Sequence, residues 1–152
     1  MRVHGTFEFR APPAAVYEAL LDPAALQSCI PGCEDLEALG PGRYRATVKV
    51  GIGGIRGTFQ GDVTITDEEP ERGYRMEVTA RGGPGTVSGT ATIRLTPSGD
   101  DTTVDVEGEA RMSGPAAGVA QRLFGGIASS MMNQFFGCMR SRVASSNEAP
   151  TA

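Results

Sequence analysis

Residues that could carry acid–base, nucleophilic or metal chemistry are few in this 152-residue sequence. His4 is its one histidine, and it falls on the polar side of an alternating segment, where we expect it to face solvent. Without His4, no Ser–His–Asp set can be assembled. Cys29 and Cys33 have the spacing C-x3-C, but no second Cys/His pair accompanies them, which argues against a zinc site. The sequence therefore predicts a protein that is not an enzyme and has no metal or cofactor of its own.

The cysteines also bear on the cellular compartment. Residues 1–10 pass directly into a strand-like pattern, without the basic and apolar regions of a secretory signal, so we expect a cytoplasmic protein. In that compartment an odd number of cysteines (Cys29, Cys33 and Cys138) favours reduced thiols. A disulfide between Cys29 and Cys33 remains the alternative.

A glycine-rich segment at residues 51–57 (GIGGIRG) has some likeness to a phosphate-binding loop. It joins two alternating segments rather than a strand and a helix, and it lacks the Lys-Ser/Thr end of such loops. We therefore interpret it as a turn with apolar tips, Ile52 and Ile55. Two alternatives stay open for these tips: they pack locally, or they converge with Pro84, Leu123 and Phe124 on an apolar rim suited to a membrane surface.

Charge and hydropathy exclude two further classes of function. The net charge is -4 and the isoelectric point is near 5.0, so nothing favours binding to a nucleic acid. No run of about 18 apolar residues is present, so no membrane-spanning helix is expected.

Alternation of apolar and polar residues is the strongest structural signal. It predicts strands at residues 3–10, 34–39, 43–52, 55–66, 74–81, 86–96 and 102–112. Short Gly- and Pro-rich links between these segments are typical of an antiparallel meander. A first helix opens at Pro12-Pro13 and ends at Asp22-Pro23, and a second covers residues 23–28. A long helix is expected over residues 115–145, with an apolar stripe along one side.

This order of elements predicts an α+β helix-grip fold. A curved antiparallel sheet of about seven strands has one apolar face, and the long C-terminal helix is the one predicted element long enough to cover it. The two short helices follow the first strand. We expect a single ligand-binding domain at residues 1–145 and a disordered polar tail at 146–152.

The inward-facing strand residues are unusually small, and this favours a pocket between sheet and helix. They are Ala46, Gly57, Gly61, Ala80, Gly89, Ala91, Gly108 and Ala110. Small residues either leave a void or let backbones approach closely, so a well-packed core is the alternative. No charged side chain is expected to point inward, which suits an apolar ligand. The predicted ligand-binding residues are Tyr17, Leu20, Val48, Ile52, Ile55, Phe59, Tyr74, Met76, Val78, Phe124, Ile127, Met131 and Phe135. Tyr17, Tyr44 and Tyr74 are the candidate polar contacts.

Two stretches of sequence resemble a known family. They are residues 11–37, with the specific motif D-P-x-x-L-x-x-C-I-P-G-C-E, and residues 51–65, GIGGIRGTFQGDVTI. Both are similar to the carbon monoxide dehydrogenase G-subunit (CoxG) family, which belongs with START and Bet v 1-like helix-grip domains. The resemblance extends to about residue 142.

The resemblance implies an accessory protein of a molybdenum-containing CO dehydrogenase or related hydroxylase. It implies binding of a lipophilic ligand, a quinone such as menaquinone or another isoprenoid lipid, at the inner face of the cell membrane. On this interpretation the protein carries the quinone to its partner enzyme through peripheral membrane contact. The alternative is an assembly or membrane-docking factor for the same enzyme, with an incidental groove.

Overall fold

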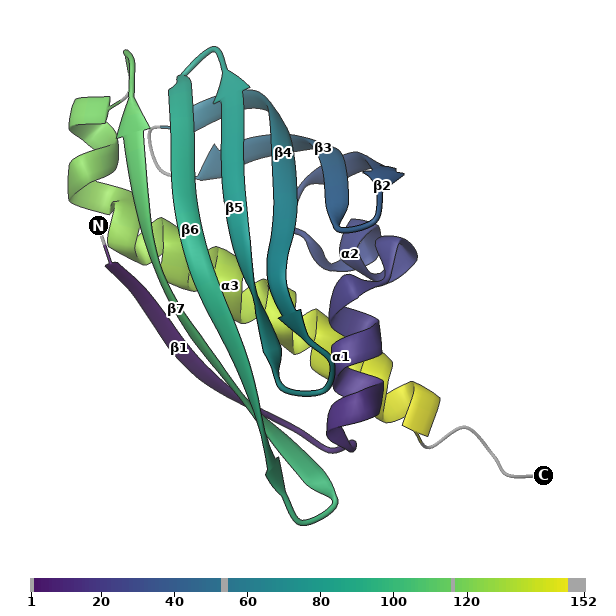
Figure 1. The fold of residues 1–152 in the computed structure, drawn as a ribbon. Coiled ribbons are helices and arrows are strands. Elements are labelled where there is room, and N and C mark those ends of the chain that lie inside the picture. The colour runs from purple at the N-terminus through teal and green to yellow at the C-terminus, as the bar shows by residue number, and fades with distance from the viewer. Residues whose placement is uncertain (1, 53–54, 116, 148–152) are drawn as a thin grey trace.

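The computed structural model describes residues 2–52, 55–115 and 117–147, and at positions 52, 55, 119–125 and 144–147 it describes the backbone alone. The elements follow one another as β1 (Arg2–Phe9), α1 (Pro13–Leu21), α2 (Pro23–Cys29), β2 (Cys33–Gly40), β3 (Arg43–Ile52), β4 (Ile55–Glu69), β5 (Gly73–Gly82), β6 (Gly85–Ser98), β7 (Asp101–Ser113) and α3 (Ala117–Asn147). Figure 1 shows the sheet curving around α3. Within the described residues, no helix combines the length and apolar character needed to cross a bilayer.

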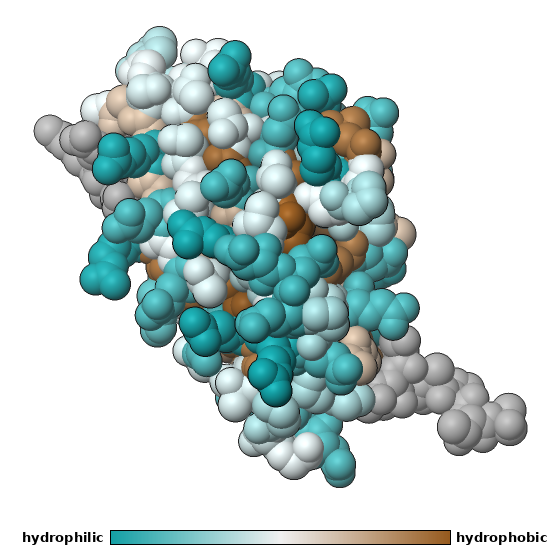
Figure 2. Space-filling model, viewed as in Figure 1, coloured by the Kyte–Doolittle hydropathy of each residue, from teal (hydrophilic) through white to brown (hydrophobic). Residues whose placement is uncertain are grey.

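All seven strands form one antiparallel sheet with the order β1-β7-β6-β5-β4-β3-β2. Each strand from β2 to β6 pairs with the next one along the chain, and β1 pairs with β7 at the other edge of the sheet. Helix α3 crosses the inner face (Figure 1). The outer face is exposed and mostly polar, as Figure 2 shows from the same side. This arrangement confirms the predicted helix-grip fold.

The two short helices are separated by a sharp bend at Asp22-Pro23. The Asp22 side chain accepts a hydrogen bond from the Ala25 backbone N–H at 3.1 Å, and Pro23 occupies the first turn of α2, so Asp22 caps that helix. The Tyr44 hydroxyl, from β3, donates to the Leu21 carbonyl oxygen at 2.8 Å. The C-terminal end of α1 is thereby held against the sheet.

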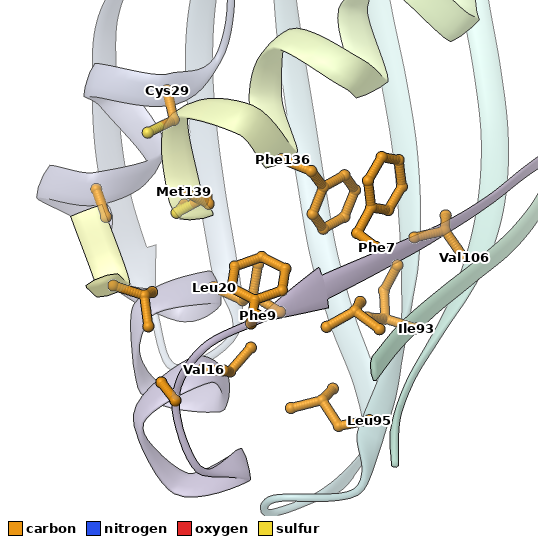
Figure 3. Close-up of a cluster of buried hydrophobic side chains, with 14 of the residues drawn as sticks. Phe7, Phe9, Val16, Leu20, Cys29, Ile93, Leu95, Val106, Phe136 and Met139 are labelled. Atoms are coloured by element: carbon orange, nitrogen blue, oxygen red, sulfur yellow. The ribbon is translucent and has the colours of Figure 1, made fainter. Parts of the chain in front are cut away.

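A densely packed core lies between the C-terminal half of α3, the helix α1 and the β1 side of the sheet (Figure 3). Phe7 and Phe136 stack with ring centroids 4.2 Å apart, and Phe9 meets Phe136 edge-on at 6.3 Å. Phe9 and Met139 have no exposed surface. This cluster contains most of the fully buried side chains, so it provides the main hydrophobic stabilisation of the fold.

The cysteine prediction is wrong in one respect. Cys29, at the end of α2, forms a disulfide with Cys138 of α3, and Cys33 is the free cysteine. The two bonded residues are 109 positions apart, with a Cα–Cα separation of 5.3 Å. Because α2 packs on α3, the fold brings together two cysteines that sequence spacing gives no reason to pair. The predicted thiols of Cys29 and Cys138, and the alternative Cys29–Cys33 bridge, are therefore replaced by a link between the two helices.

Candidate apolar ligand site

A cavity of about 380 Å³ lies between the inner face of strands β3 to β7 and the N-terminal half of α3. Its lining is composed of glycine, alanine, methionine, phenylalanine and branched aliphatic residues. They are Ile30, Ala46, Val48, Val50, Phe59, Gly61, Val63, Met76, Val78, Ala80, Val87, Met112, Ile127, Ala128 and Met131. No ionisable side chain is among them. The cavity can therefore accept an apolar group, and its described lining contains no acidic or basic side chain.

Strand register explains why space remains at this place in the sheet. Ala46 is opposite Gly61 on the neighbouring strand, and Gly61 is opposite Ala80. Opposite residues in an antiparallel pair point to the same face, so three small residues form one continuous row across β3, β4 and β5. A Cβ added at Gly61 would lie 3.3 Å from the Ala80 Cβ. The side chains of this row have a small total volume, so they leave empty space between the sheet and α3.

Helix α3 closes the cavity with one short stripe of residues. Ile127, Ala128 and Met131 contact it, at a spacing that places them on the same side of a helix. Ala128 is the smallest of the three, and it lines the same cavity as the row of small strand residues. Ile30, which follows α2, adds a further apolar side chain and is fixed by a backbone hydrogen bond to the Leu26 carbonyl at 2.9 Å.

The structure divides the sequence-predicted site residues into three groups. Six line the cavity: Val48, Phe59, Met76, Val78, Ile127 and Met131. Four belong instead to the packed core or its border: Tyr17, Leu20, Tyr74 and Phe135. The remaining three, Ile52, Ile55 and Phe124, have side chains outside the described part of the chain. Of the apolar rim predicted from these three with Leu123 and Pro84, Pro84 alone has a described side chain, and it is not among the described residues that line the cavity.

The tyrosines do not serve the cavity as polar contacts. The Tyr17 hydroxyl is 3.2 Å from Glu68 Oε1, and burial together with this carboxylate raises the pKa of Tyr17 to about 12. Burial also raises the pKa of Tyr74, whose ring meets the Tyr17 ring edge-on. Burial likewise raises the pKa of Tyr44, whose hydroxyl donates a hydrogen bond to the Leu21 carbonyl oxygen at the end of α1. Tyr17 and Tyr74 therefore help to hold α1 against the β4–β5 region, and Tyr44 holds the end of α1 against β3.

Two of the glycines predicted to create space do not do so. Gly89 and Gly108 are on the inner face by register, but their missing side chains are compensated by close backbone approach. A Cβ at Gly89 would lie 2.7 Å from the Glu109 carbonyl oxygen, and one at Gly108 would lie 2.5 Å from that of Thr90. These two glycines allow β6 and β7 to coil tightly. On the strands, the small residues that line the cavity are Ala46, Gly61 and Ala80.

Several lining residues were absent from the predicted site. They are Ile30, Ala46, Val50, Gly61, Val63, Ala80, Val87, Met112 and Ala128. For those on strands, the period-two alternation already placed them on the inner face, so a stricter use of that signal would have found them. Ile30 lies beside the cavity through the tertiary fold alone. Sequence periodicity gave no indication of the position of Ile30, whereas Ala128 is on the same helix side as the predicted Ile127 and Met131.

The described residues contain no group of three or more His, Cys, Asp and Glu side chains arranged to hold a metal ion. His4 is exposed on β1. The features that stand out are the curved sheet, the long covering helix and an apolar cavity between them. Together they define a helix-grip protein with a ligand-type cavity, the class that includes START domains.

Solved structures share this fold over nearly the whole chain. A conserved protein from Geobacillus kaustophilus is 31% identical with a TM-score of 0.91, covering 96% of this chain and 97% of its own. A START superfamily protein from Mycobacterium smegmatis is 17% identical with a TM-score of 0.71, covering 94% and 97%. The Zhui aromatase/cyclase from Streptomyces sp. R1128 is 15% identical with a TM-score of 0.77, covering 98% and 96%. The last two likenesses concern the fold alone.

The sequence profile of one family, the G subunit of carbon monoxide dehydrogenase (CoxG), matches residues 5–144. The chain therefore belongs to the CoxG family, as its sequence motifs predicted. No curated protein matches it.

Proposed function

We propose that this protein binds a lipophilic ligand, a quinone such as menaquinone, and carries it for a CO dehydrogenase-type molybdenum enzyme. The observation that carries the proposal is the cavity of about 380 Å³ with a wholly apolar lining. Its size falls within the range of roughly 300–1,000 Å³ that is usual for small-molecule sites. A prenyl chain suits such a lining, because each CH₂ group buried there contributes about 0.8 kcal/mol.

The protein's part in this function is binding rather than chemistry. Some proteins that share the fold have enzyme names, among them an aromatase/cyclase and a norcoclaurine synthase. Acid–base catalysis needs a titratable group within hydrogen-bond reach of the substrate, and the described residues that line this cavity include none. We therefore propose an accessory protein without activity of its own, whose redox partner is the enzyme named by the family.

Membrane contact is the second part of the proposal. A quinone with a prenyl tail resides in the bilayer, so a carrier must collect it there. We place the protein on the cytoplasmic side, in peripheral contact with the membrane. The three methionines of the lining, Met76, Met112 and Met131, support exchange of ligands of this kind, because their flexible side chains adapt to varied apolar shapes.

The test is to identify what the full chain carries. Protein purified from cells is extracted with organic solvent, and the extract is analysed by mass spectrometry. In parallel, the melting temperature is measured with added menaquinone and with menadione, which has the same ring system but no prenyl chain. We expect a prenylated lipid in the extract, and a rise in melting temperature with menaquinone that clearly exceeds the rise with menadione.

Absence of any co-purifying lipid, together with an unchanged melting temperature in menaquinone, would contradict the carrier function. The cavity would then be incidental. The protein would be better described as an assembly or membrane-docking factor of the enzyme.

A further inference from the structure

A disulfide joins the short helix α2 to the long helix α3. Cys29 is the last residue of α2, and Cys138 is in the C-terminal half of α3. On the cytoplasmic side of the membrane, where we place the protein, disulfides are rare, and most of those that occur are transient bonds with a catalytic or redox-sensing role. This bond is therefore a candidate for a redox-dependent change of structure.

Without the disulfide, little apolar surface would hold α2 in its place. Its two buried side chains, Ala25 and Cys29, are both small, and Leu26 is only partly buried. By contrast, α1 buries the larger side chains Val16 and Leu20. Hydrophobic stabilisation grows with the apolar area that is buried, so the disulfide provides a large part of the attachment of α2 to α3.

Both ends of α2 are tied to strand β3. Before the helix, the Leu21 carbonyl oxygen accepts a hydrogen bond from the Tyr44 hydroxyl at 2.8 Å. After the helix, the Gly32 carbonyl oxygen accepts one from the Lys49 backbone N–H at 2.8 Å. Cleavage of the disulfide would therefore release α2 from α3 while both of its ends stay attached to the sheet.

The residue that follows Cys29 lines the cavity. Ile30 is the one described lining residue that lies neither on a strand nor on α3. Its backbone N–H donates to the Leu26 carbonyl oxygen at 2.9 Å, so Ile30 is coupled to the last turn of α2. On α3, the lining residue Met131 precedes Cys138 by about two helical turns. The disulfide thus fixes one wall of the cavity against the helix that covers it.

We propose that the Cys29–Cys138 disulfide is a redox latch that sets how fast a ligand enters and leaves the cavity. While the bond is intact, α2 stays on α3 and Ile30 closes its side of the cavity. After reduction, α2 moves away from α3 between its two ties to β3, and Ile30 moves with it. The inference rests on the proposed function in one respect, namely that the cavity holds an apolar ligand.

Reduction needs a dithiol as electron donor, either dithiothreitol in solution or a protein dithiol in the cell. Cys138 is partly exposed and Cys29 is 4% exposed, so the thiolate of the donor reaches the Cys138 sulfur first. The S–S bond breaks, a mixed disulfide forms on Cys138, and Cys29 leaves as a thiolate that takes up a proton. The second thiol of the donor then attacks the donor sulfur of the mixed disulfide and releases Cys138 as a thiol. The donor becomes a disulfide, and its two electrons and two protons reside on the protein.

Cys33 is a poor nucleophile for this exchange. Its Sγ donates a hydrogen bond to the Asp35 carbonyl oxygen at 3.3 Å, and burial raises the pKa of the thiol. A raised pKa lowers the fraction of thiolate, which is the form that attacks a disulfide. Cys33→Ser is therefore a matched control for substitution of a bonded cysteine.

The first test measures ligand exchange in the full chain before and after reduction. The probe is Nile red, an apolar fluorescent dye, and Ala128→Leu, which fills the cavity, should abolish its binding if the dye occupies this site. Because α2 then opens without a covalent restraint, we expect about tenfold faster dissociation of Nile red after reduction with dithiothreitol, and the slow rate again after reoxidation. Cys138→Ser should be fast with or without dithiothreitol, whereas Cys33→Ser should behave like the unchanged protein.

Hydrogen exchange is a second test, and it needs no ligand. Reduction should speed the exchange of the α2 amides, residues 23–29, while those of α1 change little. Gly89→Ala controls for a general loss of stability, because it strains the sheet away from α2 and keeps the disulfide. We expect the α2 amides of oxidised Gly89→Ala to stay protected.

Four outcomes would overturn the inference. They are three free thiols even after oxidation, equal protection of α2 in the two redox states, equal acceleration of exchange in α1 and α2, and unchanged dissociation of cavity-bound Nile red after reduction. Redox-dependent dissociation of Nile red without any binding of menaquinone would leave the latch valid and the quinone carrier function wrong. Menaquinone binding with equal rates in both redox states would leave the carrier function valid and the latch wrong.

Discussion

The two ends of α3 cover the same sheet in different ways. Its C-terminal half presses Phe136 and Met139 onto Phe7 and Phe9, and these four side chains are at most 8% exposed. Its N-terminal half presents Ile127, which is only half-buried over the cavity. Both halves belong to one helix and one sheet, so the backbone architecture alone does not decide where a pocket forms. The volume of the inward side chains decides it.

This contrast separates two roles for apolar residues. Large side chains at the packed end maximise buried area and stabilise the fold. Small residues at the other end, Ala46, Gly61 and Ala80, give up part of that stabilisation and leave space. A disulfide between Cys29 and Cys138 links α2 to the packed half of α3. Changes at the packed end should therefore cost stability, whereas changes at the cavity should alter binding.

The largest effect is expected from truncation at the packed end. Phe136→Ala removes a ring that is 5% exposed and stacked on Phe7, and it should lower the free energy of unfolding by about 3–5 kcal/mol. Met131→Ala, on the same helix but beside the cavity, should cost about 1 kcal/mol or less, because its neighbours are already incompletely packed. Urea unfolding of the two variants measures both values. Similar losses would show that the two halves of α3 are equally packed.

The next effect concerns the link between α2 and α3. Cys138→Ser should lower the free energy of unfolding of protein purified without reductant by about 2–4 kcal/mol, since the bond closes a long loop. Cys33→Ser is the matched control and should be nearly neutral. Thiol titration of the unfolded protein should find one free cysteine. Three reactive thiols, with no difference between the variants, would contradict the disulfide.

A smaller effect should distinguish close packing from open space among the glycines. Gly89→Ala places a Cβ 2.7 Å from the Glu109 carbonyl oxygen, so it should destabilise the fold by about 1–3 kcal/mol. Gly83→Ala has no heavy atom within 4 Å of the new Cβ and should change stability little. Thermal unfolding of both variants is the measurement. A neutral Gly89→Ala would restore Gly89 as a source of empty volume.

The smallest effect is a pH dependence at the end of the sheet away from the cavity. The pKa of Tyr17 is raised to about 12 from an ordinary value of 10.0, because burial and Glu68 disfavour the phenolate. A raised pKa of this kind contributes stability that is fully present below pH 10 and is lost as pH rises towards 12. Tyr17→Phe should reduce that loss while leaving ligand retention unchanged. Stability profiles that coincide above pH 10 would show that Tyr17 does not contribute.

The strands and the fold class could be predicted because alternation is a local signal. Residues such as Val48 and Phe59 show their face directly in the sequence, and the sheet pairs them as neighbours. Where a residue lies along the curved sheet depends on contacts with residues that are distant in the sequence. Tyr17, Leu20 and Tyr74 were correctly predicted to face inward, but they lie in the packed core and not at the cavity. Only the tertiary fold determines where α1 meets the sheet. For the same reason, the pairing of Cys29 with Cys138 could not be predicted from the sequence.

The most direct test of the carrier function is to fill the cavity from the helix side. Ala128→Leu extends a cavity-lining side chain into the space, and leucine has a helix propensity close to that of alanine. Ser129→Leu makes the same residue at the next, exposed position and is the control. The measurement is the dissociation constant for menaquinone, with the melting temperature of each ligand-free variant. The account predicts at least tenfold weaker binding for Ala128→Leu with an unchanged or higher melting temperature, and normal binding for Ser129→Leu. Unchanged menaquinone binding by a well-folded Ala128→Leu protein would contradict the claim that this cavity holds the ligand.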